Sequence, residues 1–230
     1  MENIKVVFID IDNTLLDFDI AIKTGIKEGF KKYNLGEFTD EMFVTFEHIN
    51  NNLWESLQRK EITFSELKEK RFDIFFKELG INFNGQLFES NFRDFLFSFA
   101  YPVDGAIDLL NYLKNKGYIL CAASNGPLKQ QINRLTVGQM YNYFNYIFVS
   151  EDIGYSKPSK DFFKECFSRM NNKYNSSQSI MIGDSLTSDI QGAKNANMRS
   201  IFFNKHKKDA LFDFSSDYMI NELKDIKNII

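Results

Sequence analysis

Five short, nearly continuous apolar runs constrain the fold of this chain more than any other feature. They are IKVVFID (4–10), YILCAAS (118–124), YIFVS (146–150), SIMIGD (179–184) and SIFFN (200–204). Such runs are typical of strands that are buried on both faces, as in a parallel sheet. Helical patterns separate the later runs. This alternation predicts an α/β fold with a doubly wound, Rossmann-like parallel sheet and right-handed crossovers.

The helical patterns have recognisable ends. Asp104 is a candidate N-cap for a helix whose apolar face carries Leu109 and Leu113, and Gly117 is a good C-terminal stop. A second helix is expected over 162–170, after Pro158-Ser159, and a third is expected to start near Leu186.

The segment after the first run breaks the alternation, because no second strand pattern occurs before Tyr118. One apolar stripe runs over 42–57 at helical spacing, and another runs over 64–79 behind a Thr63/Glu66 capping box. We therefore predict an α/β core formed by 1–17 and 101–230, with an all-helical cap domain at 18–100.

Composition limits the classes of function. The net charge of −3 gives no reason to expect a nucleic-acid partner, and no window approaches the roughly 20 apolar residues of a membrane helix. The N-terminus has no signal-peptide pattern. Cys121 and Cys166 both lie in apolar patterns, which indicates buried reduced thiols and a cytoplasmic protein.

An acid pair closes the first strand. Asp10 ends the apolar run, and Asp12 follows two residues later. Like charges at the end of a buried strand repel one another unless something positive lies between them. The pair therefore indicates a bound cation or a reacting phosphorus atom.

Polar residues also follow the other strands. Ser124-Asn125-Gly126 ends the second, Ser150-Glu151-Asp152 leads from the third to Lys157, and Gly183-Asp184-Ser185 ends the fourth, with Asp189 a turn later. Each alone has an ordinary explanation as a turn, an N-cap or a surface lysine. Together they favour one site, because ligands of open α/β sheets bind outside the carboxyl ends of the strands.

These motifs, DIDNT (10–14), SN (124–125), KP (157–158) and GDSLTSD (183–189), resemble the four sequence motifs of the haloacid dehalogenase superfamily. The likeness covers nearly the whole chain, including the helical segment between the first two motifs. The stretches 150–163 and 182–198 further resemble the branch of pyrimidine and noncanonical-nucleotide 5′-nucleotidases.

The resemblance implies a phosphatase in which Asp10 is the nucleophile and forms an aspartyl-phosphate. Mg²⁺ would be held by Asp10, the backbone carbonyl of Asp12 and Asp184. The Asp12 side chain would point away from the metal and serve as general acid and base. Dehalogenation is rejected, because dehalogenases of this superfamily lack the acid two residues after the nucleophile and need no metal.

The remaining motif residues would handle phosphate. The resemblance assigns Lys157 to charge neutralisation, Ser124 and Asn125 to phosphate binding, and Thr14 to the same group and to bracing the loop. Asp189 would orient metal-bound water or Lys157 from outside the ligand shell.

The cap would select the leaving group. Phe18, Phe46, Trp54 and Tyr155 are candidates to stack on a nucleobase, with core packing of a Phe-rich cap as the alternative. No basic cluster in the cap indicates a second phosphate, so a small-molecule phosphate monoester is the expected substrate.

We predict a Mg²⁺-dependent phosphomonoesterase that acts on nucleoside 5′-monophosphates. Hydrolysis of phosphoglycolate or small sugar phosphates is the alternative within the enzyme class. A phospho-accepting signalling module is the alternative from another class, since it too uses clustered acids, a metal and a lysine. Such modules are about half this length and have no use for a helical insert.

Overall fold

The structure is a computed structural model that describes residues 3–205 and 216–230. The chain divides into two compact units. The α/β unit contains residues 1–18 and 100–230, and the helical unit contains residues 19–99.

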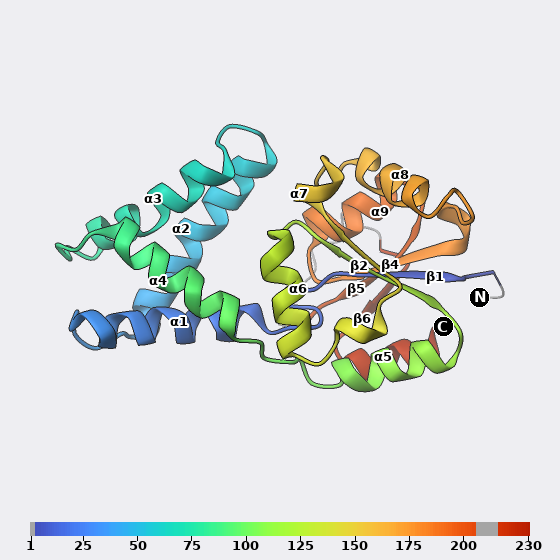
Figure 1. Cartoon of the computed structure of the whole chain (residues 1–230), viewed down its shortest axis with the longest axis horizontal. Coiled ribbons are helices and arrows are strands. Elements are labelled where there is room, and N and C mark those ends of the chain that lie inside the picture. The colour runs from blue at the N-terminus through green and yellow to red at the C-terminus, as the bar shows by residue number, and fades with distance from the viewer. Residues whose placement is uncertain (1–2, 206–215) are drawn as a thin grey trace. The chain divides into compact units, whose positions relative to one another are not determined.

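Within the described residues, the α/β unit has one six-stranded sheet with the order β3-β2-β1-β4-β5-β6 and parallel pairing throughout (Figure 1). The strands are β1 (Val6–Ile9), β2 (Ile119–Ser124), β3 (Tyr146–Val149), β4 (Ser179–Gly183), β5 (Arg199–Phe203) and β6 (Tyr218–Ile220). Five of them lie on the five apolar runs, which confirms the predicted fold class. β6 was missed, because it has three residues and only Ile220 is buried.

Helices cover both faces of this sheet. The longer ones are α5 (Ala106–Asn115), α6 (Leu128–Val137) and α8 (Lys160–Arg169), and the short ones are α7 (Ser150–Ile153) and α9 (Gln191–Asn195). Side chains of α5, α6 and the 3₁₀ helix η4 (Leu223–Asn228) pack with Val7 and Ile9 of β1, whereas α8 and α9 pack with Val6 and Phe8. Because successive side chains of a strand point to opposite faces, Val7 and Ile9 contribute to the core on one face of the sheet, and Val6 and Phe8 contribute to the core on the other face.

The predicted start of one helix was wrong. Asp104 is not the N-cap of α5, since that position belongs to Gly105, which has a φ of 80°. The predicted end is confirmed: α5 stops at Asn115, and Gly117 follows with a φ of 82°.

The helical unit consists of four helices among its described residues, α1 (Phe18–Tyr33), α2 (Asp40–Gln58), α3 (Phe64–Glu78) and α4 (Gly85–Ser98). The predicted capping box of Thr63 and Glu66 is present at the start of α3. Buried phenylalanine rings fill the interior, and Arg71 forms a buried ion pair with Glu89 at 2.7 Å. The insertion after β1 is thus a folded helical unit with its own core. None of the described helices has the length and apolar character needed to cross a membrane.

The strand order creates a topological switch point in the α/β unit. β1 pairs with β2 on one side and with β4 on the other, so the connections from β1 and β4 leave the sheet in opposite directions. Ligands bind at such a switch point, outside the carboxyl ends of the strands. Asp10 follows β1 and Asp184 follows β4 at this place.

Candidate active site

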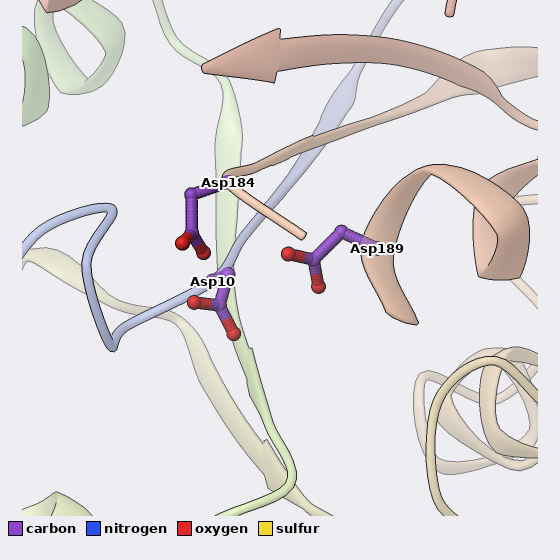
Figure 2. Close-up of side chains that lie close together, drawn as sticks. All are labelled: Asp10, Asp184 and Asp189. Atoms are coloured by element: carbon purple, nitrogen blue, oxygen red, sulfur yellow. The ribbon is translucent and has the colours of Figure 1, made fainter. Parts of the chain in front are cut away.

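Three carboxylates meet at the switch point. In the described part of the chain, Asp10, Asp184 and Asp189 each offer an oxygen atom, and these atoms lie within 4.8 Å of one another. Figure 2 shows the three side chains close together, with Asp189 on the helical segment that follows β4. Grouped carboxylate oxygens are the ligands that hard divalent cations prefer.

The position of Asp189 depends on a glycine. A Cβ atom on Gly183 would lie 2.2 Å from Oδ2 of Asp189, so only glycine permits this approach. The backbone N–H of Ser185 donates to the same oxygen at 3.1 Å. The GDSLTSD motif thereby folds back on itself and brings its second acid to the end of β4.

Lys157 neutralises part of this charge. Its Nζ atom donates at 2.6 Å to Oδ1 of Asp10, to Oδ1 of Asp189 and to the carbonyl oxygen of Ala123. The side chain is 1% exposed. Burial opposes the charged form of the lysine, but the two carboxylates outweigh burial and raise its pKa. Lys157 is therefore a buried cation fixed against two acids.

One lysine does not balance three acids. Burial raises the pKa of Asp10 from 3.8 to about 8, and the charges of Asp189 and Asp12 add to this rise while Lys157 opposes it. A divalent cation among the carboxylates would favour the ionised form. Both the donor set and the electrostatics therefore fit such a cation.

Asn125 braces the lysine loop. Its Oδ1 accepts from the backbone N–H of Lys157, and its Nδ2 donates to the carbonyl of the same residue, both at 2.9 Å. Both polar atoms of the Asn125 side chain contact Lys157 in this geometry, and a contact of the same side chain with phosphate stays a prediction.

Ser124 presents an oriented hydroxyl. Its Oγ accepts from the backbone N–H of Gly126 at 3.0 Å and from Nε2 of Gln131 at 2.8 Å. A hydroxyl has two acceptor lone pairs and one hydrogen. Because both lone pairs are engaged, the hydrogen is left to donate to another group, such as an anionic oxygen.

Asp12 belongs to a separate network. Its Oδ2 accepts from Nε2 of Gln131 at 2.6 Å, and its Oδ1 accepts from Nη1 of Arg134. The side chain is thus directed to α6 rather than into the cluster of three carboxylates. Sequence reasoning missed Gln131 and Arg134. Their spacing was a signal, because polar residues three apart lie on one face of a helix, and a helix that covers a sheet buries one of its faces.

The loop after Asp10 is held internally. Asn13 adopts a φ of 60°, and its Oδ1 accepts from the backbone N–H of Phe18 at 2.9 Å. Thr14 is fully buried, and no hydrogen-bond partner for its hydroxyl lies within residues 3–205 and 216–230. That Thr14 contacts phosphate stays a prediction.

The aromatic candidates separate by exposure. Phe46 is fully buried among the rings of Phe72, Phe75 and Phe92, which favours the alternative of core packing over contact with a substrate. Trp54 is half-buried, and its ring lies 5.8 Å from that of Phe64.

The two aromatic candidates outside the helical unit, Phe18 and Tyr155, also differ in exposure. Phe18 is half-buried, and the guanidinium of Arg134 lies 4.7 Å from its ring centroid. Tyr155 is 50% exposed, in the loop that carries Lys157.

A family model described as haloacid dehalogenase-like hydrolase matches residues 6–203. The chain belongs to this family. The model spans the residues from β1 to β5, so it includes the three-carboxylate cluster and Lys157.

Relatives of this HAD-like hydrolase are similar over their whole length. The protein YfnB of Bacillus subtilis is 31% identical, and the match covers 100% of this chain and 97% of YfnB. A crystal structure of YfnB bound to magnesium superposes on this chain with a TM-score of 0.91, and the match covers 99% of each chain.

Two relatives carry names for different reactions. The pyrimidine 5′-nucleotidase PynA of Streptococcus pneumoniae is 30% identical over 98% of this chain and 97% of PynA. A glyceraldehyde 3-phosphate phosphatase of Pyrococcus furiosus is 29% identical over 100% of this chain and 94% of that protein. Overall similarity therefore does not separate the two substrates for this HAD-like hydrolase.

Proposed function

We propose that this chain is a Mg²⁺-dependent phosphomonoesterase that hydrolyses nucleoside 5′-monophosphates through an aspartyl-phosphate on Asp10. The observation that carries the proposal is the buried contact of Asp10 with Lys157 beside Asp184 and Asp189. A carboxylate held against a cation at the end of a strand suits a nucleophile, because its oxygen is fixed and its charge is partly balanced.

Asp10, Asp184 and the backbone carbonyl of Asp12 would hold the metal, with Asp189 at its side. The donor chemistry supports Mg²⁺, and so does the crystal structure of YfnB bound to magnesium. Bound Mg²⁺ would neutralise charge on the phosphate oxygens and favour the ionised form of Asp10.

Each step of the reaction is assigned to particular side chains of the protein. An Asp10 oxygen attacks phosphorus, and the bond from phosphorus to the leaving oxygen breaks as Asp12 gives that oxygen a proton. Lys157 and the hydroxyl of Ser124 stabilise charge on the phosphoryl oxygens. In the second half, Asp12 takes a proton from water, which attacks phosphorus and releases phosphate from Asp10.

A nucleotide is favoured as the substrate for two reasons. The stretches 150–163 and 182–198 resemble 5′-nucleotidases, and the relative PynA, which is 30% identical, is named a pyrimidine 5′-nucleotidase. Glyceraldehyde 3-phosphate or another small sugar phosphate is the second candidate, favoured by the relative from Pyrococcus furiosus.

A panel of phosphate monoesters, assayed with Mg²⁺ and with EDTA, tests both levels of the proposal. We expect turnover that requires the metal, is abolished in Asp10→Asn and is fastest with nucleoside 5′-monophosphates. Faster turnover of small sugar phosphates would reverse the substrate assignment. Turnover in EDTA, or a phosphorylated protein that releases no phosphate, would overturn the reaction itself.

The cysteines support a cytoplasmic location as part of this proposal. Cys121 and Cys166 are both free and buried in the α/β unit. Burial raises the pKa of each thiol, which suits unreactive cysteines in a reducing compartment.

A further inference from the structure

Two buried polar side chains of α6 connect the groups that the proposed reaction uses on either side of the scissile bond. Gln131 and Arg134 are both 0% exposed. Asp12, which would protonate the leaving oxygen, and Ser124, which would bind a phosphoryl oxygen, both accept from Nε2 of Gln131. One amide group therefore fixes the spacing between these two residues.

The orientation of the Gln131 amide follows from its neighbours. Its Nε2 faces a carboxylate and a hydroxyl oxygen, and its Oε1 accepts from Nη1 of Arg134 at 3.3 Å. The reversed amide would place its hydrogens against the guanidinium and its oxygen against the carboxylate. The amide thus has a single satisfactory orientation, with both of its hydrogens donated.

Arg134 contacts both Asp12 and Gln131. Its Nη1 donates to Asp12 and to Gln131, whereas its Nε and Nη2 have no hydrogen-bond partner in the described part of the chain. A buried guanidinium is costly unless it is paired, and Asp12 is its ion-pair partner here. The guanidinium also lies 4.7 Å from the ring centroid of Phe18, which helps to hold it beside Asp12.

A glycine makes room for this arrangement. A Cβ atom on Gly126 would lie 2.3 Å from Nε2 of Gln131. The third residue of the Ser124-Asn125-Gly126 motif therefore permits the amide to reach Ser124. The motif and the helix that follows it are built around the same hydrogen-bonded unit.

We infer that Gln131 and Arg134 are positioning residues for proton transfer by Asp12. Each of the two Asp12 oxygens accepts from one of these residues, which fixes the plane of the carboxyl group. This inference rests on the proposed function.

The loss of kcat/KM in variants of Gln131 and Arg134, compared between esters with different leaving groups, distinguishes positioning of Asp12 from a purely structural role. The 4-nitrophenolate group leaves without a proton, whereas the alkoxide of a nucleoside needs one. We therefore expect Gln131→Met and Arg134→Met to lower kcat/KM for a nucleoside 5′-monophosphate by about a hundredfold, and for 4-nitrophenyl phosphate by less than about tenfold. Arg134→Lys should recover part of the loss, because it keeps a charged donor.

The control is Arg169→Met, which removes an exposed arginine that pairs with Asp152 and Glu165, and it should leave both substrates unaffected. An equal loss on both esters in the Gln131 and Arg134 variants would overturn the inference. If Arg134→Met does not fold, Gln131→Met gives the same test without removing a charge.

Crystal structures of the wild type and of Gln131→Met keep the two proposals distinct. We expect the Asp12 carboxyl group to leave its wild-type position in the variant, and an unchanged position would overturn the positioning role. If the wild type hydrolyses no ester, the proposed function fails, and this comparison still decides whether Gln131 positions Asp12.

Discussion

The Nζ atom of Lys157 lies 2.6 Å from Oδ1 of Asp10, although 147 positions separate the two residues in the chain. Both are buried, so their attraction is weakly screened. The lysine also binds Asp189, and it carries one positive charge against the three carboxylates of the cluster. This imbalance makes the stability of the protein depend on pH and on divalent cations.

The first prediction concerns the metal-free protein. The pKa of Asp10 is raised from 3.8 to about 8, so the folded state binds more protons than the unfolded state between these values. The contribution of Asp10 to stability is then full below about pH 4 and is lost as the pH rises through about 8. We expect the Tm in EDTA to fall over this range and Mg²⁺ to restore it most at high pH.

Asp10→Asn is the matched control for this prediction, because the amide does not titrate. Circular dichroism melts of the wild type and the variant should diverge as the pH increases. Parallel curves in EDTA would show that Asp10 is not the group responsible.

The second prediction concerns the ion pair of Asp12 with Arg134. Asp12→Asn leaves a buried guanidinium without its counter-charge, and breaking a buried pair costs about 3 to 5 kcal/mol. Because the Asp12 side chain is 26% exposed, we expect a smaller loss of about 2 kcal/mol. Urea unfolding of Asp12→Asn, Arg134→Met and the double variant measures the coupling between them. Additive losses would contradict the prediction.

The third prediction concerns Gly183. In Gly183→Ala the new Cβ would lie 2.2 Å from Oδ2 of Asp189, so the carboxylate must move out of the cluster. We expect Mg²⁺ affinity to fall by about 10- to 100-fold, as is typical when groups that support metal ligands are disturbed. Calorimetry can compare this variant with Asp184→Asn, which should also bind weakly. Asp152→Asn, which changes an exposed acid, should bind as the wild type does.

The fourth prediction concerns the lysine loop. Asn125→Ala removes both hydrogen bonds to the backbone of Lys157, so the ammonium group loses its fixed position. We expect kcat to fall by up to about a hundredfold, because small displacements of a charged group at a reacting centre are costly. Asn195→Ala is the matched control, since it also removes two hydrogen bonds, one to the carbonyl of Pro158 and one from the side chain of Gln191, and both are exposed. Equal rates for both variants would count against the bracing role.

The fifth prediction concerns substrate recognition by Tyr155, which is 50% exposed beside the lysine loop. If its ring stacks on a nucleobase, Tyr155→Ala should raise KM for nucleotides by about tenfold and leave KM for small sugar phosphates unchanged. Tyr141, which is 43% exposed on the 3₁₀ helix η1 (Tyr141–Tyr143), provides a control substitution of the same kind. The same KM change for both substrates would exclude base stacking.

The strands of the α/β unit were predictable because their apolar runs are continuous. β6 could not be found in this way, since Tyr218 and Met219 are 38% and 55% exposed. The start of α5 was misplaced because Asp104 fits an N-cap by type, whereas the turn with Gly105 at positive φ sets the actual start.

The acidic part of the site was predictable for a topological reason. Parallel strands bring their carboxyl ends to one edge, so Asp10 and Asp184 were expected at the same edge once the strands were identified, and the pairing of β1 with β4 makes them neighbours. Gln131 and Arg134 were missed because polar helix residues are normally expected to face water. The side chain of Phe46 could not be assigned, since a ring packed in the core and a ring facing a ligand have the same sequence pattern.

The division of the chain into two units has an evolutionary consequence. Every residue assigned here to bond breaking, charge neutralisation or proton transfer lies in the α/β unit, outside residues 19–99. Substitutions within 19–99 can therefore accumulate without altering the reactive groups. A lineage could therefore vary the inserted segment while inheriting its chemistry intact.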